Sequence, residues 1–123
     1  MDCLFCQREK LEILKESEQC FAIYDKYPVT NMHSLILPKR HLRHFFNLNK
    51  LEREKLFDFV EEIKTFLETT DPSIDGFNVG MNCEASAGQT IFHCHIHLIP
   101  RRSGDISEPM GGVRGVIPSK RIY

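Results

Sequence analysis

The sequence predicts an α+β domain with an antiparallel sheet, and two observations support this fold class. One long amphipathic segment is flanked on both sides by short apolar runs that are typical of strands. Several of these runs are only a few residues apart, which is too short for the crossover that parallel strands need. The chain has 123 residues, the size of a single domain, so we expect one domain over residues 1–123.

The composition is typical of an ordinary globular protein. Sixteen Lys and Arg balance 17 Asp and Glu to a net charge of −1, which gives no support for a nucleic-acid or anionic-membrane partner. No apolar run approaches the ~18 residues of a membrane span, and the first residues lack the pattern of a signal peptide, so we expect a cytoplasmic protein. The six His and five Cys are many for this length and need an explanation.

The N-terminal third predicts two strands. Residues 9–17 mix charged and apolar side chains, and we expect them to be irregular or weakly helical. Residues 19–24 are typical of a strand that ends in the turn-forming run 25–28. Residues 33–37 form the second expected strand, which stops at Pro38 because proline cannot donate to a sheet ladder.

A long helix is predicted from about Lys50 to Thr69. Asn49 suits the N-cap and Glu52 stands at the third helical position, which together make a capping box. The Asp-Pro pair at 71–72 ends the helix. One buried stripe is expected, formed by Leu56, Val60, Ile63 and Leu67.

The C-terminal half predicts two more strands and a tail. Residues 76–82 form the third expected strand, followed by a loop of small residues at 82–89. Residues 91–99 form the fourth expected strand, which Pro100 ends. The C-terminal tail, residues 101–123, is rich in Gly, Pro and Arg.

Cys3 and Cys6 form a Cys-x-x-Cys pair. This spacing lets a short turn aim two thiolates at one tetrahedral metal, most often zinc, and distant Cys or His must then complete the site. A redox Cys-x-x-Cys motif is disfavoured, because such a motif normally lies at the start of a helix that follows a strand, and we expect no strand before Cys3. Unligated thiols remain the alternative to zinc. The other cysteines are expected to be small buried apolar residues, and they are Cys20, Cys83 and Cys94.

Three histidines alternate with apolar residues inside the last predicted strand. Side chains alternate between the faces of a strand, so His93, His95 and His97 are expected to form one row. One interpretation is a catalytic metal site, although the outer two rings would lie about 13 Å apart along the strand. A second is a merely solvated sheet face. A third is a nucleophilic imidazole whose neighbours orient it and handle protons.

The loop before the histidines favours the third interpretation. Gly88 allows backbone N–H groups to approach an anion, and the side chains of Gln89 and Thr90 add neutral donors. Such donors beside a histidine nucleophile suit phosphoryl or nucleotidyl transfer, because negative charge builds on the phosphate oxygens. The chain has no Walker-type phosphate loop, which excludes a P-loop nucleotidase.

These residues resemble the histidine triad (HIT) family, in its zinc-containing bacterial and archaeal type. Residues 93–99, His-Cys-His-Ile-His-Leu-Ile, match the family's alternating pattern, and the preceding Ala-Gly-Gln-Thr at 87–90 is also similar. The upstream Pro-Lys-Arg-His at 38–41 has family-like spacing. The tail at 105–118 resembles that of members described as dinucleoside polyphosphate hydrolases.

The resemblance implies a HIT-like fold with a five-stranded antiparallel sheet, one long and one short helix, and a homodimer. It also implies a purine nucleotide ligand and hydrolysis at the α-phosphate of dinucleoside polyphosphates through a nucleotidyl-histidine intermediate. Two alternatives stay open, an adenosine phosphoramidate hydrolase and a nucleotide-binding regulatory module with little turnover. Some distant relatives that transfer rather than hydrolyse replace the last triad histidine with Gln, so His97 favours hydrolysis.

The resemblance also implies a role for each site residue. His95 is the nucleophile, while His97 and His33 flank it and contact phosphate, and His97 helps to hold its tautomer. Asp25 is expected to hold the ribose hydroxyls. The phosphate site is expected to comprise Asn82, Gly88, Gln89 and Thr90. A structural Cys2His2 zinc site, which includes the N-terminal segment 1–10, is expected to comprise Cys3, Cys6, His41 and His93. His44 has no matched role and is expected on an exposed helix surface.

Overall fold

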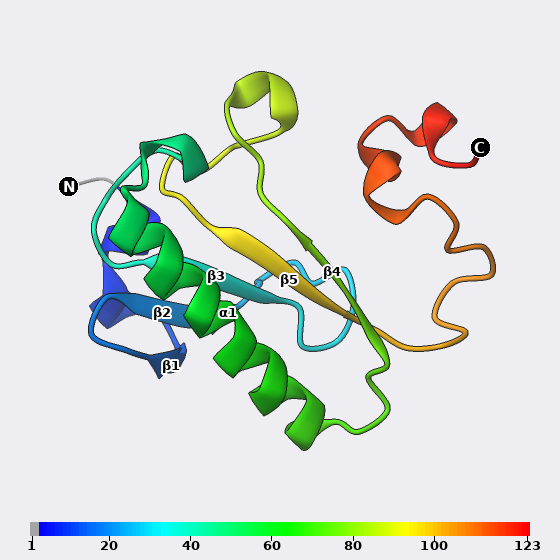
Figure 1. Ribbon diagram of the computed structural model, residues 1–123, viewed down its shortest axis with the longest axis horizontal. Coiled ribbons are helices and arrows are strands. Elements are labelled where there is room, and N and C mark those ends of the chain that lie inside the picture. The colour runs from blue at the N-terminus through cyan, green and yellow to red at the C-terminus, as the bar shows by residue number, and fades with distance from the viewer. Residues whose placement is uncertain (1–2) are drawn as a thin grey trace.

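The fold is a five-stranded antiparallel sheet with one helix across one face (Figure 1). The structure, a computed structural model, describes residues 3–123, so the first two residues of the predicted zinc segment 1–10 lie outside the described residues. The strand order is β1-β2-β3-β5-β4, and every neighbouring pair is antiparallel. The strands are β1 (Ile13–Glu16), β2 (Cys20–Tyr24), β3 (Ser34–Pro38), β4 (Gly76–Gly80) and β5 (Ile96–Arg101). The predicted α+β class is confirmed.

Helix α1 spans Lys50–Thr70 and begins with the predicted capping box. The Asn49 side chain accepts a hydrogen bond from the Glu52 N–H at 2.8 Å, and the Glu52 carboxylate accepts from the Asn49 N–H at 2.9 Å. The buried side chains of α1 are Leu56, Phe59, Ile63 and Leu67. Val60 of the predicted stripe is only half-buried and packs at the edge of the core, while its neighbour Phe59 is fully buried. Among residues 3–123, no helix has the length and apolar character to cross a bilayer.

The N-terminal segment corrects one sequence expectation. Residues 9–17, expected to be irregular or weakly helical, contain the end of a 3-10 turn at Arg8–Lys10 and the edge strand β1. The pairing of β1 with β2 shifts register between Ile13 and Lys15, and none of its four residues is fully buried. A short, bulged edge strand lacks the strict alternation of buried and exposed residues that a sequence pattern detects.

Strand β5 starts five residues later than the sequence suggested. Residues 91–95 are irregular because their polar groups bond outside the sheet ladder. The Cys94 N–H donates to the Leu42 carbonyl at 2.8 Å, and the buried His93 ring bonds the Pro38 carbonyl at 2.8 Å. Only His97 of the three alternating histidines therefore lies in a strand. The predicted alternation still holds, because Cys94 and Ile96 pack in the cluster under α1 while the rings of His95 and His97 lie 5.2 Å apart on the other side. Strand β4 likewise ends at Gly80 rather than at residue 82.

Apolar clusters cover both faces of the sheet. The larger cluster joins α1 to side chains such as Ala22, Ile36 and Ile96. The smaller cluster lies on the opposite face, because its strand residues alternate with those of the first. Its buried members are Phe5, Phe21, Ile23, Leu35 and Leu37. His97 is the register partner of Leu35 on β3, so the histidines are presented on the face away from α1.

Candidate active site and metal centre

A cleft of about 1670 Å³ contains most of the predicted catalytic and binding residues. Apolar residues line one part of it, including Phe5, Ile23 and Leu35 of the smaller cluster. Seven of the predicted catalytic and phosphate-site residues line the same cleft, and they are Asp25, His33, Asn82, Gly88, Thr90, His95 and His97. The fold therefore gathers side chains from four separate segments around one hollow.

The hydrogen bond of His95 determines which ring nitrogen is free. Its Nδ1 lies 2.8 Å from the backbone carbonyl oxygen of His93. A carbonyl only accepts, so Nδ1 must carry the proton and Nε2 keeps its lone pair. This bond differs from our expectation that His97 holds the tautomer, because a backbone group of the neighbouring segment does so. A lone pair on Nε2 is what a nucleophilic imidazole requires.

His33 and His97 form a second hydrogen-bonded pair. The Val29 N–H donates to Nδ1 of His33 at 3.0 Å, so the proton of His33 is on Nε2. That Nε2 lies 2.9 Å from Nδ1 of His97 and donates to it. The proton of neutral His97 is therefore on its own Nε2. The Asp25 carboxylate lies 3.4 Å from Nε2 of His33 and 3.8 Å from Nδ1 of His97.

The environment keeps this pair uncharged at neutral pH. Burial, together with the nearby rings of His95 and His33, lowers the pKa of His97 to about 4, although Asp25 opposes the shift. Burial also lowers the pKa of His33, again opposed by Asp25. Both rings are therefore neutral, and His97 is the one of the pair whose Nε2–H remains available as a donor. An anion bound beside them would favour their protonation, because opposite charges raise the pKa of an imidazole.

The loop between β4 and residue 91 carries the predicted phosphate site. Gly88 ends the 3-10 turn Ala85–Ala87 with φ +94°, a left-handed conformation that strains L side chains. The Asn82 amide nitrogen lies 3.9 Å from the position that a Cβ on Gly88 would occupy. Gly88 thus brings its exposed backbone close to an amide donor at the cleft wall.

Gln89 has a different position from the one we expected. Its side chain is buried and does not line the cleft. Its amide nitrogen donates to the carbonyls of Arg43 at 2.6 Å and Ile91 at 3.2 Å, and its amide oxygen accepts from the Glu84 N–H at 2.8 Å. Both side-chain N–H groups are used, so Gln89 supports the loop rather than offering a donor to an anion.

Glu84 fastens the same loop to the segment after β3, and sequence reasoning missed it. Its φ of +80° is unusual for a residue with a side chain. Its carboxylate accepts two hydrogen bonds from Arg43 at 2.7 and 2.9 Å and lies 3.1 Å from Nε2 of His44. His44 is therefore not on a helix surface, as we expected, but caps the 3-10 turn Phe45–Asn47. No local pattern identifies partners forty residues apart.

Replacing Gln89 with leucine is expected to loosen the loop. The change leaves two carbonyls and one N–H without their partner, at about 2 kcal/mol or more of unfolding free energy. Urea denaturation measures the loss, and amide exchange of residues 84–90 should accelerate. Ser86→Ala, an exposed change in the same loop, serves as the matched control and should alter neither. Wild-type stability and exchange in Gln89→Leu would contradict the supporting role.

The four predicted metal ligands come together outside this cleft. Cys3 and Cys6 lie on either side of a 3-10 turn, His41 follows β3, and His93 precedes β5. Nδ1 of His93 lies 3.4 Å from Sγ of Cys3, 3.5 Å from Sγ of Cys6 and 3.3 Å from Nδ1 of His41. Sγ of Cys6 lies 3.2 Å from Nδ1 of His41. All four ligand atoms lie within 4.8 Å of one another.

These separations fit a tetrahedral zinc ion. With Zn–S near 2.3 Å and Zn–N near 2.0 Å, a tetrahedron has S–N edges of about 3.5 Å and N–N edges of about 3.3 Å. The observed separations of 3.2 to 3.5 Å match these edges. Nε2 of His93 donates to the Pro38 carbonyl at 2.8 Å, which leaves Nδ1 as the ligand atom. The cluster is consistent with zinc in both donor type and geometry.

Two contacts connect the metal centre to His95. Phe5, between the two cysteines, is buried and packs edge-on against the rings of His93 and His95, with centroids 6.1 and 5.3 Å apart. The His93 carbonyl fixes the His95 tautomer. The residues of the Cys/His cluster therefore also support the ring that we expect to react.

Comparisons with known proteins agree with this geometry. The family model for the HIT domain matches residues 7–104. An Arabidopsis thaliana protein named adenylylsulfatase HINT3 is 37% identical over 108 residues, which cover 85% of this chain and 54% of that protein. A Mycobacterium tuberculosis protein named AP-4-A phosphorylase is 30% identical, over 76% of this chain and 48% of that protein. The chain thus spans about half the length of these two relatives.

One similar solved structure contains zinc. It is a zinc-bound histidine triad family protein from Mycobacterium smegmatis, and the two structures match with a TM-score of 0.80. The two sequences are 28% identical, and the match covers 88% of this chain and 81% of that one.

Proposed function

This chain belongs to the HIT family, and from that premise we propose that it hydrolyses dinucleoside polyphosphates at the α-phosphate. The reaction would pass through a nucleotidyl intermediate on His95. The single observation that carries the proposal is the His95 tautomer, because its Nδ1–H bond to a carbonyl leaves Nε2 with a lone pair in a cleft that Asn82, Gly88 and Thr90 also line. The name of the M. tuberculosis relative, AP-4-A phosphorylase, supports the same substrate class.

The proposed reaction has two steps. The Nε2 lone pair of His95 attacks the α-phosphorus, and a P–N bond forms as the P–O bond to the leaving nucleotide breaks. His97, with its proton on Nε2, donates a hydrogen bond to a phosphate oxygen or to the leaving oxygen. Water then cleaves the P–N bond, which releases the mononucleotide and restores the ring.

The other lining residues are assigned to binding. Asp25 would hold the ribose hydroxyls, and the backbone at Gly88 with the side chains of Asn82 and Thr90 would bind phosphate oxygens. Gln89 would act only by supporting this loop. The apolar part of the cleft, which includes Phe5 and Leu35, offers a surface for a purine base.

We also propose that the Cys2His2 cluster is a structural zinc site and that the protein is a homodimer. A site with four protein ligands has no open position for substrate, so zinc there would stabilise the fold. The ligands would be Cys3, Cys6, His41 and His93. Zinc would supply no chemistry to the phosphate, and its contribution would be to hold Phe5 and His93 against His95.

Adenosine phosphoramidate is the second candidate substrate. The same nucleophile would split a P–N bond to a small leaving group, and the name adenylylsulfatase of the A. thaliana relative points to an adenylyl compound with a small leaving group. A regulatory module that binds nucleotides with little turnover is the remaining candidate, and kinetics decide between them.

A side-by-side turnover assay tests the proposal. Diadenosine polyphosphates of increasing bridge length, adenosine phosphoramidate and adenylyl sulfate are each given to the wild-type protein, and kcat/KM is measured for AMP release. The highest kcat/KM is expected on a diadenosine polyphosphate, with kcat of about 1 s⁻¹ or more. Higher kcat/KM on adenosine phosphoramidate would select the second candidate, and kcat far below this value on every compound would select the regulatory module.

A further inference from the structure

The C-terminal tail lines the same cleft as the catalytic histidines. On β5, alternate residues share a face, and His97, Ile99 and Arg101 all line the cleft. Arg101 is about 13 Å from His97 along the strand, at about 3.3 Å per residue. The cleft continues from this point onto the chain that follows β5. Lining residues there include Ile106, Pro109, Val113, Val116 and Arg121.

This extension makes the cleft larger than one nucleotide requires. Sites for single small ligands usually have volumes of about 300–1,000 Å³. The cleft here has a volume of about 1670 Å³. Figure 1 shows the tail, coloured orange to red, beside the edge strand β4. The tail does not cross α1. The tail residues and the catalytic histidines line one and the same cleft.

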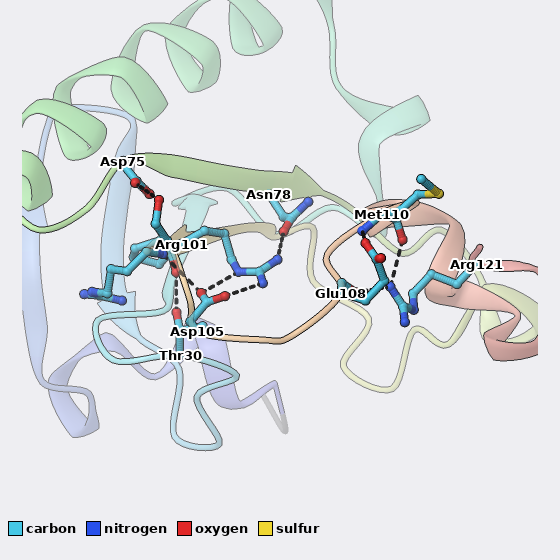
Figure 2. Close-up of polar contacts among 11 residues, drawn as sticks. Thr30, Asp75, Asn78, Arg101, Asp105, Glu108, Met110 and Arg121 are labelled. Carbon is cyan, nitrogen blue, oxygen red and sulfur yellow. Dashed lines mark hydrogen bonds and ion pairs between the residues drawn. The ribbon is translucent and has the colours of Figure 1, made fainter. Parts of the chain in front are cut away.

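Polar contacts hold the base of the tail in place (Figure 2). Arg101 donates two hydrogen bonds to Asp105 at 2.8 and 2.7 Å, and a third to Asn78 of β4 at 2.8 Å. Gly112, with φ +42°, brings the tail back to Asn78, because a Cβ there would lie 3.2 Å from its amide nitrogen. The tail is thus bonded to β4 through Arg101 and approaches it again at Gly112.

The far end of the tail closes on itself around Arg121. Nη1 of Arg121 donates to the carbonyls of Glu108 and Met110, each at 2.7 Å (Figure 2). A Cβ at Gly111 would lie 1.8 Å from the Arg121 carbonyl oxygen, so only glycine fits this crossing. These contacts give the tail a defined shape beside the cleft.

The chemistry of this extension suits a nucleotide. Arg121 forms no ion pair with any residue from 3 to 123, and its Nε and Nη2 make no hydrogen bond within that range. Its positive charge is therefore available to an anion. Val113 and Val116 are 62% and 76% exposed, which leaves apolar surface for a base or ribose. Arg101, by contrast, is already neutralised by Asp105.

We propose that the tail forms a binding subsite for the second nucleotide unit of a dinucleoside polyphosphate. Arg121 would contact the distal phosphate, and the two valines would contact the distal nucleoside. This inference rests on the proposed function for its substrate class and adds where the leaving half binds. A mononucleotide in the catalytic half would not reach these residues.

The test compares two ligands and does not depend on turnover. A diadenosine tetraphosphate with methylene bridges, which resists hydrolysis, and AMP are titrated into the wild-type protein by calorimetry. The double change Val113→Ser with Val116→Ser should raise the Kd of the dinucleotide about tenfold and the Kd of AMP less than twofold, since only the former loses apolar contacts. Arg121→Gln should give the same selective loss.

The matched control changes the neighbouring apolar residues that do not line the cleft. Ile117→Ser with Ile122→Ser alters side chains that are 57% and 54% exposed, and it should leave both Kd values within twofold. Equal effects on AMP and the dinucleotide, or no effect on either, would overturn the subsite. A changed molecular mass of the Val113/Val116 variant in solution would also overturn the subsite, because it would show that the tail mediates contacts between copies of the chain. If the proposed function is wrong but the subsite is right, the wild-type protein will show no turnover and will still bind the dinucleotide selectively.

Discussion

Replacing His95 with alanine is expected to abolish turnover of every nucleotide substrate. Among residues 3–123, His95 is the only imidazole of the cleft whose Nδ1–H is bonded to a backbone carbonyl, so that its Nε2 keeps the lone pair. The change removes this ring. Loss of a covalent nucleophile typically lowers kcat by roughly 10⁴-fold or more. Steady-state kinetics measure this loss, and acid-labile nucleotide bound to protein should be trapped in the wild type and absent from His95→Ala.

The variant should still fold and bind metal. The His95 ring is half-buried and does not belong to the metal cluster, so we expect zinc content to be unchanged. His44→Ala is the matched control, because this histidine lies outside the cleft and should retain kcat within a few fold. Activity of His95→Ala at the wild-type level would refute the nucleophile, whatever its substrate.

Replacing Cys3 with serine is expected to remove zinc and destabilise the protein. A hard hydroxyl is a poor substitute for a thiolate, and the three remaining ligands then surround an incomplete site. We expect a loss of roughly 3 kcal/mol or more of unfolding free energy, which lowers Tm by about 10 °C in a domain of this size. Elemental analysis measures zinc per chain, and calorimetry measures Tm.

The same change should also slow catalysis in the protein that remains folded. Phe5 lies between the two cysteines and packs against the His95 ring, so a loosened turn removes a support of that ring. Cys83→Ser is the matched control, since this half-buried cysteine is outside the cluster and should keep both zinc and Tm. One zinc per chain in Cys3→Ser, or the wild-type Tm, would contradict a structural metal at this cluster.

The long helix and the metal ligands differ in how the sequence predicts them. The capping box at Asn49 and the apolar period of α1 are local signals, and the structure matches both. The grouping of Cys3 and Cys6 with His41 and His93 has no local signal, and it came from a family resemblance. The fold brings them together because β3 ends beside the segment that leads into β5.

Sequence alone determined the fold class, the helix and the residue types that gather in the cleft, because periodicity and short motifs are carried by neighbouring residues. Tertiary structure decided the start of β5, the tautomers of the histidines and the supporting role of Gln89. Each of these depends on a hydrogen bond to a backbone group whose position no local pattern contains, such as the carbonyls of His93, Pro38 and Arg43. Tertiary structure also decided the contribution of the tail to the cleft, because that contribution depends on how Arg101 and Gly112 lie against β4.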